Sequence, residues 1–251
     1  MDDARQRFTI TVDDYERFRP SYPDELYDEL TSAAGLTPGA TVVDVGCGTG
    51  ISTRPWQARG MIAIGVEPNQ AMRERALSKG GARYLEGTAQ ATTLPDGSAD
   101  LVCAAQAFHW FPVDATLVEW QRILRPRGIA AVFWNVRDQA PLMREYEALL
   151  DTLGEYQKVP KPEPTLAKLR AHPWVRVVRE LALPNVQWLD QDGFFGRARS
   201  SSYVAHSPTE RERVEAALAE LYARHRSPDG QIAFTYTTVA MLFALDRNHQ
   251  G

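Results

Sequence analysis

Short apolar runs and amphipathic stretches alternate through the first half of the chain. Two stretches have the composition of helices: 69–81, closed by two glycines, and 114–128, with Asp114 as its N-cap and Pro126 at its end. The mainly apolar runs between and around them predict strands at 40–46, 61–68, 82–87, 98–108 and 128–136. This alternation predicts an α/β protein whose parallel sheet has helices on both faces. Ligands of such sheets bind at the carboxyl ends of the strands.

The pattern changes in the second half. A helical apolar stripe runs through 141–157, and a proline-rich connection follows at 158–165. Residues 207–210 form a capping box that opens a helix to about Arg224, and 231–245 is rich in β-branched and aromatic residues. We interpret this half as helical elaboration and late strands carried on the sheet.

These elements suggest an organisation along the chain. One further helix is expected around Asp24–Ala34, before the first strand. We therefore expect an N-terminal helical segment over 1–38, a ligand-binding core over 39–138, and an elaboration over 139–251 that completes the same domain.

Composition narrows the class of protein. Lys and Arg total 28 and Asp and Glu total 32, and a net charge of −4 gives no support for a nucleic-acid or membrane partner. Cys47 and Cys103, the two cysteines, form neither a disulfide framework nor a metal-ligand pattern. The N-terminus lacks an apolar signal core, and the longest apolar runs are too short to span a bilayer. We expect a soluble cytoplasmic protein without a metal, as a monomer or homodimer.

The stretch "VVDVGCGTG" (42–50) directs the search for chemistry. It places Gly46, Gly48 and Gly50 after a predicted strand and before a helix. Each glycine adds backbone entropy that folding must remove, so this density indicates that something approaches the backbone closely. The dinucleotide fingerprint has a wider spacing, G-x-G-x-x-G, and a P-loop would need a Gly-Lys-Ser/Thr ending.

A second feature supports a bound ligand. Glu67 ends the second predicted strand, 21 positions after Gly46, where an acidic side chain can accept hydrogen bonds from ribose hydroxyls. The alternative is a tight turn with an exposed glutamate beside it.

Together these residues resemble the class I S-adenosylmethionine-dependent methyltransferases, in particular their small-molecule branch. "VVDVGCGTG" is similar to the family's first motif, "GVEPNQAMRERA" to its ribose segment and "EGTAQATTLPDGSADLV" to its adenine segment. "AAQAFHWF" and 119–135 resemble its fourth and fifth strand regions, and "YERFRPSYPDEL" resembles the N-terminal segment of a "QAFHWF" subgroup. The likeness covers residues 15 to about 136 and is weak beyond, through "SSSY" (200–203) and the final strand.

The resemblance implies a Rossmann-like, doubly wound, mostly parallel seven-stranded sheet and S-adenosylmethionine as cofactor. The methionine and ribose parts would pass over the three glycines, and Glu67 would bind the ribose. The adenine would lie between Pro68 and Met72 on one side and the segment after Gly87 on the other. The implied cofactor-binding set is Tyr15, Arg19, Tyr22, Asp44, Gly46, Cys47, Gly48, Thr49, Gly50, Glu67, Pro68, Met72, Thr88, Ala89, Gln90, Gln106 and Ala107.

Two parts of this set depart from the family or allow another role. Thr88, Ala89 and Gln90 stand where many relatives have an acidic residue for the adenine amine, so the carbonyl of Gln90 or the backbone of Ala89 would replace it. Asp44 resembles an aspartate near the ligand's amino group. A buried acid bonded to the amides of the glycine loop is an equal alternative for Asp44.

The resemblance also favours a lid formed by the N-terminal segment. Tyr15 and Tyr22 would close over the cofactor, and Arg19 would pair with its carboxylate. A surface helix with a solvated arginine is the alternative.

The methyl acceptor is expected beside "QAFHWF", at the carboxyl end of the fourth strand. His109 is placed to take a proton from an acceptor hydroxyl or ring nitrogen, because histidine titrates near neutrality. A histidine that stacks with Trp110 and shapes the pocket is the alternative. We expect His109, Trp110 and Trp134 to bind the acceptor, with Gln106 and Ala107 flanking the methionine end of the cofactor.

Two other functions share parts of the pattern. An NAD-dependent oxidoreductase would need the wider glycine spacing and a Tyr-x-x-x-Lys pair or similar, and we find neither. A non-catalytic S-adenosylmethionine-binding protein would carry the same motifs, because methyl transfer needs little beyond positioning.

Overall fold

A computed structural model describes residues 12–157, 161–201 and 210–246 of the chain. The helices are α1 (Val12–Phe18), α2 (Asp24–Ala34), α3 (Arg54–Ala58), α4 (Gln70–Lys79), α5 (Val113–Ile123), α6 (Pro141–Asp151), α7 (Gly154–Gln157), α8 (Pro162–Ala171), α9 (Gln191–Arg199), α11 (Arg211–His225) and the 3₁₀ helix η2 (Phe108–Trp110). The strands are β1 (Thr41–Val45), β2 (Ile62–Val66), β3 (Arg83–Leu85), β4 (Ala99–Ala105), β5 (Leu124–Arg137), β6 (Val175–Leu189) and β7 (Ile232–Leu245).

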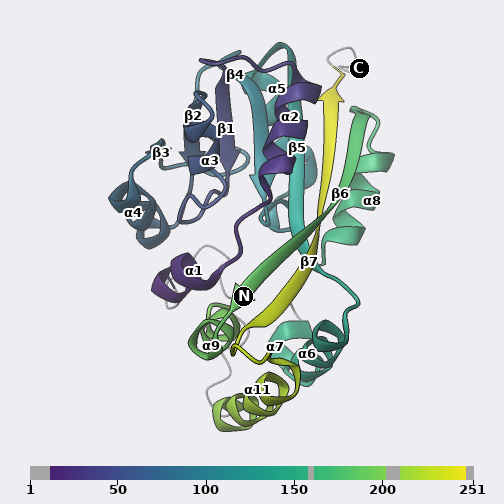
Figure 1. Cartoon of the computed structure of the whole chain (residues 1–251). Coiled ribbons are helices and arrows are strands. Elements are labelled where there is room, and N and C mark those ends of the chain that lie inside the picture. The colour runs from purple at the N-terminus through teal and green to yellow at the C-terminus, as the bar shows by residue number, and fades with distance from the viewer. Residues whose placement is uncertain (1–11, 158–160, 202–209, 247–251) are drawn as a thin grey trace. The chain divides into compact units, whose positions relative to one another are not determined.

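The strands form one sheet in the order β3-β2-β1-β4-β5-β7-β6 (Figure 1). β1 pairs in parallel with β2 on one side and with β4 on the other, and β2–β3 and β4–β5 are also parallel. The seven-stranded α/β fold expected from the sequence is confirmed. Because the strand order reverses at β1, the carboxyl ends of β1 and β4 border the crevice where such folds bind ligands.

The chain divides into two compact units, each built from separated segments. The first, the helical unit, comprises residues 1–20, 135–160 and 184–237, and the second, the sheet unit, comprises 21–134, 161–183 and 238–251. The sheet unit carries β1 to β4, most of β5 and every residue of the predicted core except its last four.

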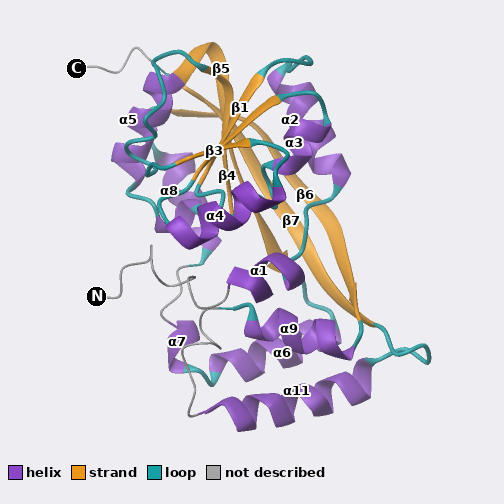
Figure 2. Cartoon of the chain, turned by 90° about the vertical axis from the view of Figure 1, so that its left-hand side faces the viewer, coloured by secondary structure: helices purple, strands orange, loops and turns teal. Residues whose placement is uncertain are grey.

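The sheet unit has helices on both faces of the sheet. In Figure 2, α5 lies on one face and α2 and α3 lie on the opposite face. Tyr27 of α2 and Trp56 of α3 are buried, with ring centroids 4.9 Å apart. On the other face Phe108 packs on Trp120 of α5 at 5.2 Å. Every residue of β1 is buried, as expected for a strand covered on both sides.

The helical unit has its own core. Tyr146 of α6, Phe194 of α9 and Phe234 of β7 are fully buried in it. Arg197 is buried as well, and it donates hydrogen bonds to the hydroxyls of Tyr236 and Ser201.

Some expected elements differ from those found. α5 ends at Ile123 and β5 begins at Leu124, so Pro126 lies within a strand and does not end the helix. Asp114 is not the N-cap, which is Pro112; Asp114 lies in the first turn. The expected proline-rich connection contains the start of α8, and β6 and α9 were not predicted. Residues 207–209 of the capping box and 202–203 of "SSSY" lie outside the described residues.

Within the described ranges, none of the helices combines the length and the apolar character that crossing a membrane requires.

Candidate functional site

The turn after β1, residues 46–50, hereafter the glycine turn, begins the site. Gly46, Gly48 and Gly50 have φ values of 69°, 56° and 82°, in the left-handed region that favours glycine. The amides of Gly46 and Cys47 donate to the carbonyl oxygen of Val66 at 2.8 and 3.3 Å. The end of β2 therefore fixes the start of this turn.

Two of these glycines are closely approached by the protein itself. A Cβ at Gly46 would lie 2.8 Å from Cβ of Ala107 and 2.9 Å from Cζ of Phe111. A Cβ at Gly50 would collide with the hydroxyl oxygen of Tyr84. Packing within the chain thus accounts for glycine at both positions. The same contacts place the segment after β4 directly against the glycine turn.

Glu67, at the end of β2, holds the middle of this turn. Its Oε2 accepts a hydrogen bond from the amide of Gly48 at 2.9 Å, and its Oε1 accepts from the amide of Asn69 at 2.8 Å. The side chain is 8% exposed, and burial raises its pKa, against the lowering effect of the two amides. A carboxylate oxygen can accept more than one hydrogen bond, so Glu67 retains capacity for a ligand hydroxyl.

Asp44, inside β1, is fully buried and binds hydroxyl groups. Its Oδ2 accepts from Oγ of Ser52 and Oγ1 of Thr53, each at 2.6 Å, and Sγ of Cys103 lies 3.9 Å from its Oδ1. Burial raises the pKa of Asp44 from 3.8 to about 6, and the two hydroxyl groups oppose that rise. No surface of this carboxyl group is open, so a direct ligand contact would require the segment of Ser52 and Thr53 to move.

The expected adenine segment forms a tight turn. The amide of Thr88 donates to the carbonyl of Ala91 at 3.0 Å, and the amide of Ala91 donates back at 3.2 Å. Ala89 is buried at this turn and Gln90 is exposed, while Met72 of α4 is buried.

The segment that follows β4, residues 106–111, hereafter the aromatic segment, has a constrained backbone. Gln106 has a φ of 56°, which is unusual for a residue with a side chain, and its amide donates to the carbonyl of Phe133 at 2.9 Å. Such conformations cluster at functional sites. η2 then turns Phe108 into the core and leaves His109 and Trp110 half-buried.

His109 is bonded to the neighbouring strand. Nε1 of Trp134, in β5, donates a hydrogen bond to Nδ1 of His109 at 3.0 Å. The ring centroids of His109 and Trp110 are 5.2 Å apart. Burial lowers the pKa of His109 from 6.5 to about 4. The imidazole is therefore neutral at physiological pH.

Most of the predicted site residues belong to one unit. The sheet unit contains Tyr22, Asp44, Gly46, Cys47, Gly48, Thr49, Gly50, Glu67, Pro68, Met72, Thr88, Ala89, Gln90, Gln106, Ala107, His109, Trp110 and Trp134. Tyr15 and Arg19 lie in the helical unit, where Arg19 donates to the carbonyl of Ser200 at 3.2 Å and lies over the Tyr15 ring. Their role as a lid stays a prediction.

Three residues that shape the site were not in the predicted set. Tyr84 and Phe111 are the side chains that meet the glycine turn, and Thr53 bonds Asp44. No motif marks Tyr84 or Thr53. Phe111 belongs to "QAFHWF", but its contact with Gly46 depends on how two strands lie side by side.

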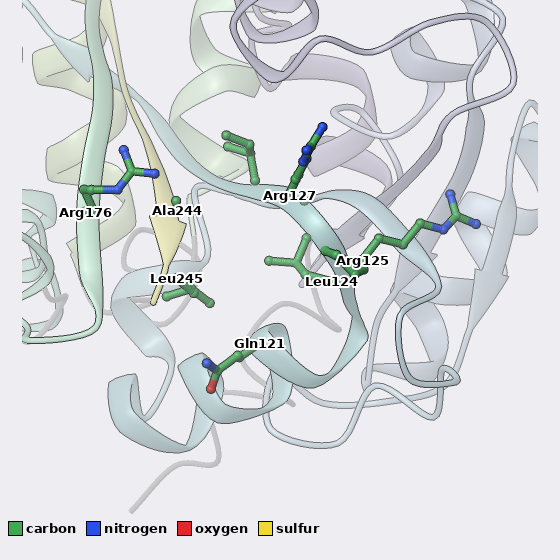
Figure 3. A pocket seen from close by; sticks show the side chains of 10 residues that line it. Gln121, Leu124, Arg125, Arg127, Arg176, Ala244 and Leu245 are labelled. Atoms are coloured by element: carbon green, nitrogen blue, oxygen red, sulfur yellow. The ribbon is translucent and has the colours of Figure 1, made fainter. Parts of the chain in front are cut away.

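A surface cavity of about 420 Å³ lies elsewhere in the sheet unit. Leu124 and Ile129 at the start of β5 and Ala244 and Leu245 at the end of β7 line it, and the side chains of Arg125, Arg127 and Arg176 surround it (Figure 3). Their guanidinium groups point in different directions, and Arg125 is bonded to Asp100. The start of β5 pairs with the start of β4, so this cavity is at the opposite strand ends from the glycine turn.

The described residues contain no group of three or more His, Cys, Asp or Glu side chains that could hold a metal ion.

Known proteins resemble this chain over nearly its whole length. Residues 43–151 match a family described as a methyltransferase domain. An uncharacterized methyltransferase of Mycobacterium tuberculosis is 32% identical over 249 residues, which cover 95% of this chain and 96% of the relative.

Solved structures show the same fold. A candidate type II methyltransferase from Anaeromyxobacter dehalogenans superposes with a TM-score of 0.68 at 24% identity, covering 90% of this chain and 98% of the other. The phosphoethanolamine N-methyltransferase 2 of Haemonchus contortus, solved with S-adenosyl-L-methionine, gives a TM-score of 0.55 at 14% identity, over 96% of this chain and 58% of its own length.

Proposed function

Because the chain belongs to the class I S-adenosylmethionine-dependent methyltransferases, we propose that it transfers a methyl group to an oxygen or nitrogen of a small-molecule acceptor. The enzyme class and the cofactor follow from the family, and the cofactor supplies an electrophilic methyl group. The observation that carries the proposal is the contact between the glycine turn and the aromatic segment, through Gly46, Ala107 and Phe111. This contact places the segment expected to bind the cofactor next to the segment expected to bind the methyl acceptor.

The residues present suit the cofactor. The amide of Gly48, in a left-handed turn, is held by Glu67, whose carboxylate retains lone pairs for ribose hydroxyls. Thr49 is buried, and its hydroxyl has no partner among the described residues. Met72 and Ala89 are apolar and buried, and they are the side chains expected to border the adenine ring. These residues, with the other members of the predicted cofactor set that lie in the sheet unit, would hold the cofactor against the ends of β1 and β2.

The acceptor is assigned to the surface beside the aromatic segment. His109 and Trp110 are half-buried there, and Trp134 holds the histidine ring through a hydrogen bond to Nδ1. The net charge of −4 gives no support for a nucleic-acid acceptor, so we favour a small molecule. As further parts of the proposal, the enzyme is cytoplasmic and acts as a monomer or homodimer.

Transfer of labelled methyl groups tests the proposal. The full chain is incubated with methyl-labelled cofactor and a panel of phenols, carboxylic acids and N-heterocycles, and label is counted in the small-molecule fraction. We expect at least one class to be methylated on oxygen or nitrogen. Label that appears only in protein or nucleic acid, or binding of the cofactor with no transfer to any acceptor, would contradict it.

A further inference from the structure

The hydrogen bond between Trp134 and His109 decides where the histidine carries its proton. An indole nitrogen only donates, so Nδ1 of His109 must offer its lone pair across the 3.0 Å contact. A neutral imidazole with an unprotonated Nδ1 carries its proton on Nε2. Burial, which lowers the pKa to about 4, keeps the ring in this neutral form at physiological pH.

The other ring nitrogen is available. Within the described ranges, Nε2 of His109 makes no hydrogen bond to another residue, and this atom is not completely buried. His109 is half-buried, whereas Trp134 is fully buried. The buried tryptophan thus holds Nδ1, and the N–H group on Nε2 is left at the partly exposed side of the residue.

We propose that His109 donates a hydrogen bond from Nε2 to an oxygen of the methyl acceptor, and that Trp134 is the positioning residue that fixes this tautomer. This inference rests on the proposed function and deepens it. The base role expected from the sequence needs a free lone pair on Nε2, which this tautomer lacks. The substrate class that fits carries a hydrogen-bond-accepting oxygen, such as a carboxylate, carbonyl or phenolate, at or beside the methylated atom.

Nuclear magnetic resonance tests the tautomer without any acceptor. The chain has five histidines, so long-range proton–nitrogen spectra of histidine-labelled protein with S-adenosylhomocysteine are assigned by the signals lost in His109→Gln. We expect the Nε2–H tautomer at pH 7. The Nδ1–H tautomer, or a charged ring, would overturn the inference. In Trp134→Phe, which removes the donor, the two tautomers should mix.

Matched variants test the donor role in turnover. Glutamine places an amide N–H near the position of Nε2, whereas asparagine places its amide near Nδ1. With an acceptor found in the panel, His109→Ala and His109→Asn should raise the acceptor KM roughly 10–100-fold, the scale for a hydrogen bond to a charged oxygen. His109→Gln should restore most of that loss. Equal losses of kcat in the glutamine and alanine variants would indicate a general base and overturn the inference.

Failure of this inference and failure of the proposed function give different results. If the proposed function fails, the parent protein methylates none of the small molecules. If only the inference fails, the parent methylates an acceptor, but the spectra show the other tautomer or glutamine gives no rescue.

Discussion

Glu67 accepts hydrogen bonds from two backbone amides and so stabilises the glycine turn. The same carboxylate is proposed to bind the ribose hydroxyls of the cofactor. Glu67→Ala should weaken binding of S-adenosylhomocysteine by about 1.5–3 kcal/mol, the scale for hydrogen bonds to a charged group. Glu67→Gln should lose almost as much, because its amide nitrogen only donates and its single oxygen replaces just one of the two oxygens that accept from Gly48 and Asn69. Isothermal titration calorimetry measures both losses.

Glu86 offers a matched control for this substitution. It follows β3, and its side chain is 78% exposed in an ion pair with Arg73. Glu86→Ala should therefore leave the affinity for S-adenosylhomocysteine unchanged. Parental affinity in Glu67→Ala would show that the ribose assignment is wrong.

Asp44 makes a pH-dependent contribution to stability. Because burial raises its pKa from 3.8 to about 6, the folded protein keeps the proton to a higher pH than the unfolded chain. This stabilisation is complete below the unfolded pKa and is lost as the pH rises through 6. The free energy of unfolding of the parent, relative to Asp44→Asn, should fall by roughly 2–2.5 kcal/mol between pH 4 and 7. Urea unfolding of both proteins measures the difference, and a difference independent of pH would refute the buried-acid account.

At the scale of elements, the contact between the glycine turn and the aromatic segment holds the site together. Gly46→Ala should destabilise the fold by roughly 1–3 kcal/mol, because the new methyl group meets Ala107 and Phe111. Gly35→Ala is the control, since Gly35 has a similar φ of 62° but no atom within 4 Å of its added Cβ. Both variants are destabilised by placing alanine in a left-handed backbone conformation, and only Gly46→Ala also adds the steric collision. Equal free energies of unfolding of the two variants in urea would contradict this account, because they would show that the aromatic segment moves aside without cost.

The sequence predicts elements where one physical signal dominates. The bounds of α2, Asp24–Ala34, match the expected helix, and β1 with its glycines was expected from an apolar run that ends in a turn. β6 was not predicted because Arg, Glu and Pro residues interrupt its apolar residues. β6 lies at the edge of the sheet, where one face meets solvent and such residues are tolerated.

At the scale of the whole molecule, sequence motifs name the site residues but not the contacts between them. His109 and Trp134 are 25 positions apart, and they meet only because β4 and β5 pair with a particular register. Tyr84 reaches Gly50 for the same kind of reason. Periodicity within one element carries no information on such pairs, so the tautomer of His109 and the partners of Asp44 required the structure.

Calorimetric titration of the full chain with S-adenosylhomocysteine and, separately, with NAD tests the central claim most directly. The glycine turn, Glu67 and the adjoining aromatic segment predict one site that binds S-adenosylhomocysteine and does not bind NAD. Saturable heat with S-adenosylhomocysteine, reduced in Glu67→Ala, is the expected result. Tight binding of NAD with no response to S-adenosylhomocysteine would contradict the account.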